Sequence, residues 1–160
     1  MSKHPLDQIT IHCRNLPGLA LLAELHHAAF SPQGERSWGS EEFADILAIA
    51  GTSATLYRSD DKPVGFVIVR TVLDEAELIS IAVDPAYQSK GFAKKMLDDT
   101  IRQVKTSKIS RFFLEVREDN SKALKLYRAT NFKKISERKD YYKTLNGQRL
   151  NAHVFLLDMN

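Results

Sequence analysis

The segment from Glu77 to Val104 begins with the residues ELISIAVDPAYQSKGFAKKML and carries the strongest structural signal in the chain. Ile79, Ile81 and Val83 alternate with small residues, which is the period of two expected of a strand with a buried face. Pro85 ends the ladder because proline has no N–H to donate. Beyond the glycine that follows, apolar or small residues recur at helical spacing: Ala93, Met96, Leu97, Thr100, Ile101 and Val104. The segment therefore predicts a strand, a glycine turn and a long helix.

The junction between this strand and helix has the features of an anion site. A helix start presents unpaired N–H groups and a partial positive charge, and Gly91 lets a ligand approach the backbone closely. Lys90, Lys94 and Lys95 lie in or beside the first helical turn, where the dipole disfavours cations unless an anion is bound. We therefore predict a cradle for a phosphate or pyrophosphate. An ordinary loop with surface lysines has the same spacing, so that alternative stays open.

The hexapeptide Gln88-Ser89-Lys90-Gly91-Phe92-Ala93 resembles the Q/R-x-x-G-x-G/A signature of the GNAT acetyltransferases. The match includes the preceding strand and the following helix, and alanine stands where that family often has glycine. In the family this turn holds the pyrophosphate of acetyl-coenzyme A. The resemblance implies acetyl-coenzyme A as cosubstrate, no metal, and the following cofactor-binding residues: Ile81, Ala82, Val83, Gln88, Ser89, Lys90, Gly91, Phe92, Ala93, Lys94 and Asn120.

Other strands and helices are predicted on both sides of this segment. Alternating or apolar runs favour strands at residues 9–13, 53–58, 64–72, 111–116, 131–138 and 151–157. Polar caps precede helical spacing at Asn15, at Ser40 and at Asn120 or Ser121. Residues 59–63 read as a polar turn, and Asn146-Gly147 is a hairpin signal. Short loops between the strands that precede the helix indicate an antiparallel meander.

The resemblance implies an α+β fold with α/β/α layering. We expect a single GNAT-type domain over residues 1–160, with a mixed, mostly antiparallel sheet of about seven strands and about four helices. Two central strands should splay apart, which would leave backbone groups of Ile81 and Val83 facing the pantetheine arm of the cofactor. A chain of 160 residues is long enough for one such core.

Composition indicates the class of protein, its cellular compartment and the partners to expect. Hydrophobic residues make up 43% and charged residues 27%, as in ordinary globular proteins, and a net charge of +3 is far from that of a nucleic-acid-binding tail. Cys13 is the single cysteine, so no intramolecular disulfide can form and a reducing compartment is expected. The first residues lack the apolar run of a signal peptide, and the apolar stretch at residues 16–30 is too short to span a membrane. We expect a cytoplasmic protein with no membrane contact and no direct nucleic-acid binding.

The C-terminal half resembles one branch of the GNAT family, the bacterial ribosomal-protein alanine N-acetyltransferases. The residues that carry this resemblance are Leu114-Glu115-Val116-Arg117, Asn120, Ala123, Leu126-Tyr127, Asn131-Phe132, Arg138 and Tyr141-Tyr142. Asn131 replaces a glycine of the branch pattern. Asparagine tolerates left-handed backbone angles better than most residues, so the helix end can survive.

The same resemblance implies roles in acetyl transfer. Glu115 would be the general base that acts on the amine, and Tyr127 the acid that protonates the sulfur of coenzyme A. The peptide-acceptor side would be lined by Trp38, Arg138, Tyr141 and Tyr142. Each residue also has a structural reading. Glu115 could pair with Arg117 or a lysine, Tyr127 could be a helix-core aromatic, and Trp38 could pack at a helix entry. Arg138 could be a solvated arginine, and Tyr141 and Tyr142 could be an aromatic pair in a hairpin.

We therefore expect an acetyltransferase that modifies the N-terminal α-amine of a protein, specifically a ribosomal protein that begins with alanine. The α-amine has a pKa near 7.7–8.0, against about 10.4 for lysine, so a single glutamate deprotonates it more easily. Acetylation of a lysine side chain or a small amine is the first alternative. A non-catalytic module that binds RNA or the ribosome is the second. The oligomeric state cannot be predicted.

Overall fold

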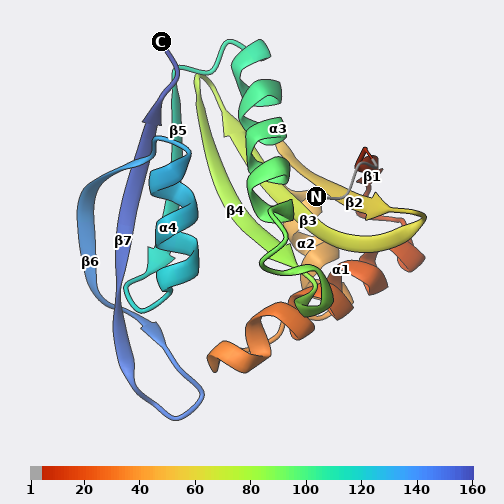
Figure 1. Ribbon diagram of the computed structural model, residues 1–160, viewed down its shortest axis with the longest axis horizontal. Coiled ribbons are helices and arrows are strands. Elements are labelled where there is room, and N and C mark those ends of the chain that lie inside the picture. Colours follow the sequence, from red (N-terminus) through yellow and green to blue (C-terminus); the bar gives the residue numbers. More distant parts are fainter. Residues whose placement is uncertain (1–4) are drawn as a thin grey trace.

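The computed structural model describes residues 5–160, which form one seven-stranded sheet with helices on both faces (Figure 1). The strands are β1 Asp7–Ile11, β2 Thr52–Ser59, β3 Lys62–Val72, β4 Glu75–Val83, β5 Arg111–Arg117, β6 Lys133–Lys143 and β7 Arg149–Asp158. The helices are α1 Leu16–Phe30, α2 Ser40–Ala48, α3 Phe92–Thr106 and α4 Ser121–Ala129, with short 3-10 turns η1 Ser31–Gln33 and η2 Pro85–Tyr87. The predicted α+β class is confirmed.

The sheet has the order β1-β2-β3-β4-β5-β7-β6, and every neighbouring pair is antiparallel except β4 with β5. β4 and β5 pair only at their first residues, Glu75–Leu78 with Arg111–Leu114. Beyond that point β4 continues along β3 to Val83, while β5 continues along β7 to Arg117. Figure 1 shows the two strands diverging. The predicted splay of the central strands is therefore present.

Two hydrophobic cores fill the layers on either side of the sheet. Helices α1 and α2 cover β1 to β4 on one face, with Leu19, Leu22, Phe43, Leu56 and Phe66 almost fully buried. On the other face, α3 and α4 pack over a core that includes Met96, Leu97, Phe112, Leu114, Tyr127 and Phe155. Truncating one of these large apolar side chains to alanine costs roughly 2–5 kcal/mol of stability.

Several local predictions are confirmed at the level of single atoms. The Oδ1 of Asn15 accepts from the backbone N of Gly18 at 3.0 Å, and the Oδ1 of Asn120 accepts from Ala123 N at 3.1 Å, so both asparagines cap helices. Asn131 has φ 69°, the left-handed conformation that a glycine would supply at the end of α4.

Other boundaries differ from those predicted. Gly39, not Ser40, is the N-cap of α2; its backbone N donates to Glu42 Oε1 at 3.4 Å, and the serine is already helical. Pro63 belongs to β3 rather than to the preceding turn. It can do so because β4 pairs with β3 only from Gly65 onward, so its missing N–H interrupts no bond to β4. β1 ends before Cys13, which lies outside the strand.

Candidate active site

The turn between η2 and α3 has the backbone that the anion prediction requires. Ser89 and Gly91 adopt left-handed angles, with φ 61° and 81°. Gly91 is the N-cap of α3 and provides no side-chain hydrogen bond to the first helical N–H groups. A Cβ built on Gly91 would meet no atom within 4 Å, so the space in front of these N–H groups is open. The turn can therefore receive an anion on its backbone.

The side chains of this turn are held in different ways. Gln88 donates from Nε2 to the carbonyl of Val83 at 3.0 Å and so ties the turn to the unpaired end of β4. Lys94 pairs with Asp98 at 2.6 Å, whereas Lys90 lies over the ring of Tyr87, with 5.7 Å from its Nζ to the ring centroid. Phe92 is buried, so only its backbone is available to a ligand.

The part of β4 that pairs with β3 but not with β5 borders this turn. It contains the predicted pantetheine contacts Ile81, Ala82 and Val83, and β5 pairs with none of them. The side chains of Ala82 and Val83 are buried in opposite cores, which leaves the backbone as their contact surface. Asn120 lies at the start of α4, where Oδ1 caps the helix and Nδ2 donates to Gln33 Oε1 at 3.3 Å.

Glu115 points away from the α3–α4 core, because its neighbours Leu114 and Val116 are buried there and side chains alternate along a strand. It helps to line a cavity of about 270 Å³ whose charged residues are Arg70, Glu75, Glu77, Glu115 and Arg138. Its Oε1 lies 3.0 Å from the Nε of Arg138. The ion pair considered as an alternative role for Glu115 therefore exists, but its partner is neither Arg117 nor a lysine.

Tyr127 lies on the opposite side of the sheet from Glu115. It is 6% exposed and packs edge-on against Phe132, with ring centroids 5.9 Å apart. Burial, together with the nearby Tyr142, raises the pKa of the Tyr127 phenol. The hydroxyl therefore stays protonated at neutral pH and is a donor.

The acceptor-side residues divide into two places. Arg138, Tyr141 and Tyr142 lie together on β6: the guanidinium is 5.0 Å from the Tyr141 ring centroid, and the two tyrosine rings are 5.2 Å apart. The pKa of Tyr142 is raised by burial and then by the charges of Glu35 and Glu115. Trp38 instead stacks on His26, with ring centroids 4.7 Å apart. This is the packing at a helix entry that was the alternative to a role on the acceptor side.

Sequence reasoning missed Glu35 and the partners of Arg117. Arg117 is 6% exposed and contacts Glu35, Asp119 and the carbonyl of Gln33. Burial raises the pKa of the Glu35 carboxyl, and Arg117 partly offsets that rise. No spacing in the sequence could have paired residues 82 positions apart; the one available signal was a charged residue in a loop that follows an apolar helix.

Comparison with known protein families assigns this chain to one of them. The model of the acetyltransferase (GNAT) family matches residues 19–132, which include the Gln88–Ala93 turn, Glu115 and Tyr127. This chain belongs to the GNAT acetyltransferase family. Members of the family use acetyl-coenzyme A, so the predicted enzyme class, an acetyl-coenzyme A-dependent N-acetyltransferase, is confirmed. The non-catalytic reading is thereby disfavoured.

Named relatives of this GNAT enzyme act on a ribosomal protein. This chain is 45% identical over 101 residues to the [ribosomal protein bS18]-alanine N-acetyltransferase of Haemophilus ducreyi. The match covers 63% of this chain and 70% of the relative. The enzyme of that name from Escherichia coli K12 is 30% identical over 139 residues, 87% of this chain and 88% of the relative. The crystal structure of the ribosomal-protein-S18-alanine N-acetyltransferase from Escherichia coli superposes with a TM-score of 0.82 at 28% identity, covering 98% and 95% of the two chains.

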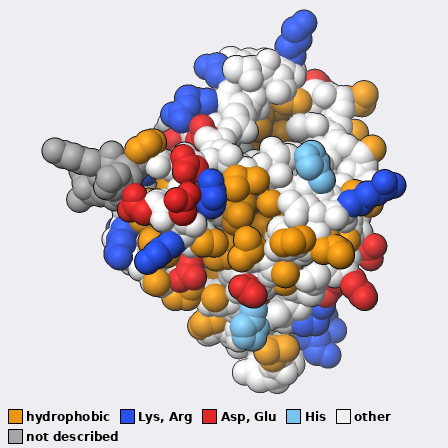
Figure 2. All heavy atoms as spheres, turned by 90° about the vertical axis from the view of Figure 1, so that its right-hand side faces the viewer, with side chains coloured by type: hydrophobic (Ala, Val, Ile, Leu, Met, Phe, Trp, Pro, Cys, Tyr) orange, Lys and Arg blue, Asp and Glu red, His pale blue; other side chains and the backbone are white. Residues whose placement is uncertain are grey.

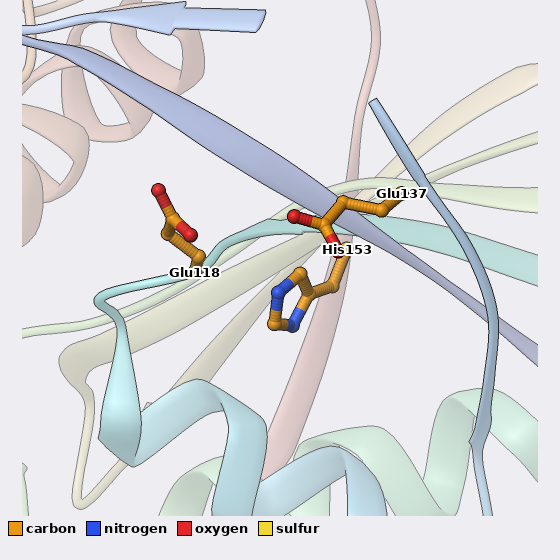
Figure 3. A group of neighbouring side chains, drawn as sticks. All are labelled: Glu118, Glu137 and His153. Carbon is orange, nitrogen blue, oxygen red and sulfur yellow. The ribbon is translucent and has the colours of Figure 1, made fainter. Parts of the chain in front are cut away.

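A second polar group of this GNAT enzyme has ligand types that suit a metal ion. Glu118 in the turn after β5, Glu137 on β6 and His153 on β7 place one ligand atom each within 4.8 Å of one another (Figure 3). Asn151 donates to both carboxylates, at 2.9 and 2.7 Å, and Lys134 pairs with Glu137 at 3.0 Å. The carboxylates thus have protein partners without an ion, and the prediction that the enzyme needs no metal stays a prediction.

The distribution of surface charge and the lengths of the helices concern the two expected absences, nucleic-acid binding and membrane contact. On the face in Figure 2, Lys and Arg side chains are interspersed with Asp and Glu and do not gather into one basic surface. Within residues 5–160, every helix is too short or too polar to cross a membrane.

Proposed function

We propose that this enzyme transfers the acetyl group of acetyl-coenzyme A to the N-terminal α-amine of a ribosomal protein that begins with alanine. The observation that carries the proposal is the identity of 30–45% to enzymes named for that reaction on ribosomal protein bS18. The protein substrate is therefore the bS18 N-terminus or one like it. The site is compatible with this substrate, because Glu115 lines a cavity together with Arg138 of β6, whose guanidinium lies 5.0 Å from the Tyr141 ring centroid.

The proposed reaction is a direct transfer. The neutral amine attacks the thioester carbonyl with its lone pair, the carbon–sulfur bond breaks, and the departing thiolate takes the bonding electrons. Glu115 accepts the proton that the amine loses, and Tyr127 donates a proton to the sulfur. Glu115 directly follows the point where β4 and β5 diverge, and Tyr127 comes from α4 in the core on the opposite face of the sheet. Backbone N–H groups at the unpaired end of β4 are candidates to stabilise the developing oxyanion.

The proposed binding of acetyl-coenzyme A uses the residues already described. The pyrophosphate would lie on the backbone of Gln88 to Ala93 at the start of α3, and the pantetheine arm along Ile81 to Val83. Asn120 would contact the cofactor from the start of α4, with Gln33 as its present partner. On the acceptor side, Arg138, Tyr141 and Tyr142 would contact the peptide.

A small-amine acceptor is the second candidate, and one observation favours it. The cavity beside Glu115 is also lined by Glu75 and Glu77, and carboxylates attract cationic amines. Arg70 and Arg138 line the same cavity and oppose such an acceptor.

A peptide panel distinguishes the two candidates. The enzyme is incubated with acetyl-coenzyme A and each of three acceptors: a bS18 N-terminal peptide beginning with alanine, the same peptide with a blocked N-terminus and internal lysines, and spermidine. Mass spectrometry then locates the acetyl group. Acetylation of the first peptide at its α-amine is the expected result. Acetyl found only on lysine side chains or only on spermidine would refute the proposed acceptor and leave the enzyme class standing.

A further inference from the structure

One buried guanidinium ties the connection between α1 and α2 to the end of β5. Nη1 of Arg117 donates to the carbonyl of Gln33 at 2.9 Å and lies 3.3 Å from Glu35 Oε1. Its Nε and Nη2 donate to the two carboxylate oxygens of Asp119 at 3.0 and 2.8 Å. The side chain is 6% exposed. A single residue therefore joins segments that are 82–84 positions apart in the sequence.

The arrangement differs from a surface ion pair. Exposed pairs contribute little, whereas a buried charge is tolerated only when its donors are paired with good geometry. The planar fork of arginine holds Asp119 on one edge and the connection on the other, which a lysine ammonium cannot do. The contacts of Arg117 therefore require the shape of the arginine side chain as well as its charge.

The connection that Arg117 holds, residues 31–39, borders the acceptor side of the site. The carbonyl of Gly34 accepts from Leu145 N at 3.1 Å, which joins the connection to the turn between β6 and β7. Asn120 reaches the connection through Gln33. Burial and then the charge of Glu35 raise the pKa of Tyr142, which lies near the end of β6 that leads into this turn. One short segment thus contacts the β5 end, the start of α4 and the β6–β7 turn.

We propose that Arg117 is a positioning residue for the acceptor: it holds Gln33 and Glu35 against β5, so that the wall facing Tyr142 is ordered before the peptide binds. This inference rests on the function proposed above. A wall that is ordered in advance lowers the entropic cost of binding the acceptor. The turn that would hold the pyrophosphate lies on another segment. Among the proposed cofactor contacts, Asn120 reaches this connection, through Gln33, so acetyl-coenzyme A binding should depend on Arg117 less than peptide binding does.

The test uses Arg117→Lys, with Arg102→Lys as the matched control. Arg102 is also paired with an aspartate, at 3.1 Å, but lies exposed on α3. We expect the KM for peptide to rise on the order of tenfold in Arg117→Lys while the KM for acetyl-coenzyme A stays within about twofold. Arg102→Lys should match the wild type. Asp119→Asn, which leaves the bonds from Arg117 to the connection in place, should have a smaller effect than Arg117→Lys.

A second measurement needs no acceptor. Trp38 is the one tryptophan in the chain and lies in the same connection, so its fluorescence reports on that segment and on its packing against His26 and Phe43. Emission from Arg117→Lys should shift to longer wavelength in the free enzyme, with the circular dichroism spectrum unchanged. A folded Arg117→Lys enzyme with unchanged peptide KM and unchanged Trp38 emission would overturn the proposal. So would an equal rise in both KM values, since that indicates general loosening of the fold.

The two proposals fail in distinguishable ways. If the wild-type enzyme acetylates no α-amine, the proposed function is wrong. The KM comparison is then made with the amine that the panel identifies, and Trp38 emission still decides whether Arg117 orders the connection.

Discussion

Arg138 on β6 contacts Glu115 on β5 across the intervening strand β7, with 3.0 Å between Nε and Oε1. The proposed base and a predicted peptide-binding residue are therefore partners in the structure without substrate. The arginine side chain is 56% exposed, so the pair contributes at most about 1 kcal/mol to stability. Its consequence is chemical: a peptide that draws Arg138 away would free the carboxylate to accept a proton.

Replacing the proposed base should slow the chemical step. We expect Glu115→Gln to lower kcat by roughly 10²–10⁴-fold, because the amide cannot take the amine proton, while coenzyme A affinity is retained. Glu77→Gln is the matched control, since Glu77 lines the same cavity from β4. Steady-state kinetics and calorimetry measure the two quantities. A folded Glu115→Gln enzyme with full turnover would leave only the ion pair with Arg138 as the role of this residue.

Removing the proposed acid should also lower kcat. Tyr127→Phe keeps the ring packing against Phe132 but has no proton for the thiolate, so kcat should fall while the melting temperature changes little. Because burial raises the pKa of this phenol, it remains protonated to above its ordinary value of 10.0, and it should cause no alkaline loss of kcat between pH 7 and about pH 10. Unaltered kcat in Tyr127→Phe would restrict this tyrosine to core packing.

The glycine of the turn should be essential for cofactor binding. Gly91→Glu places a side chain and a negative charge in the open space before α3, where the pyrophosphate is proposed to bind. We expect a large loss of coenzyme A affinity by calorimetry. Gly147→Glu is the matched control, because Gly147 also has a left-handed φ, 84°, and open space around its Cβ. If both variants bind coenzyme A equally, the pyrophosphate does not lie at this turn.

Two adjacent tyrosines should differ in their effect on the peptide. Burial and the charge of Glu35 raise the pKa of Tyr142, so its hydroxyl remains a hydrogen-bond donor at neutral pH. Tyr142→Phe should raise the KM for peptide and leave that for acetyl-coenzyme A unchanged. Tyr141, which is 50% exposed, is the comparison, and Tyr141→Phe should have the weaker effect. The reverse order would show that Tyr141 makes the closer contact.

Stability should depend on pH through His26. Its pKa is lowered from 6.5 to about 4, first by burial and then by Arg36 and His27, with Glu42 opposing. The folded protein thus binds this proton less tightly than the unfolded chain, so the contribution is complete above pH 6.5 and falls as the pH approaches 4. Between pH 7 and pH 4.5 the loss should be about 2–3 kcal/mol.

Denaturant unfolding at both pH values measures this loss. His26→Gln should lose less stability than the wild type over the same interval, and His27→Gln should lose about as much as the wild type. Protonation would also remove the ring nitrogen that accepts from Trp38 N at 3.2 Å, so Trp38 emission should change over the same pH range. Equal losses in the wild type and His26→Gln would assign the acid sensitivity to other groups.

The sequence by itself determined the features that depend on neighbours along the chain. The alternation before Pro85, the glycine at 91 and the asparagine caps act through backbone angles and hydrogen bonds within a few residues, so they could be predicted and are present. The family signature extended this to the enzyme class, because the glycine turn that carries the signature is itself a local structure.

Only the tertiary structure decided which charges meet. Glu115 and Arg117 lie on one face of β5, and sequence reasoning considered them as a pair, yet each has a distant partner. Glu115 meets Arg138 because β7 lies between β5 and β6 and the long arginine side chain reaches diagonally across it: Ser136, not Arg138, is the β6 residue in line with Glu115. Arg117 meets Glu35 because α1 folds back over the sheet. Strand order and register arise from burying both faces of the sheet at once, and no short stretch of sequence specifies that arrangement.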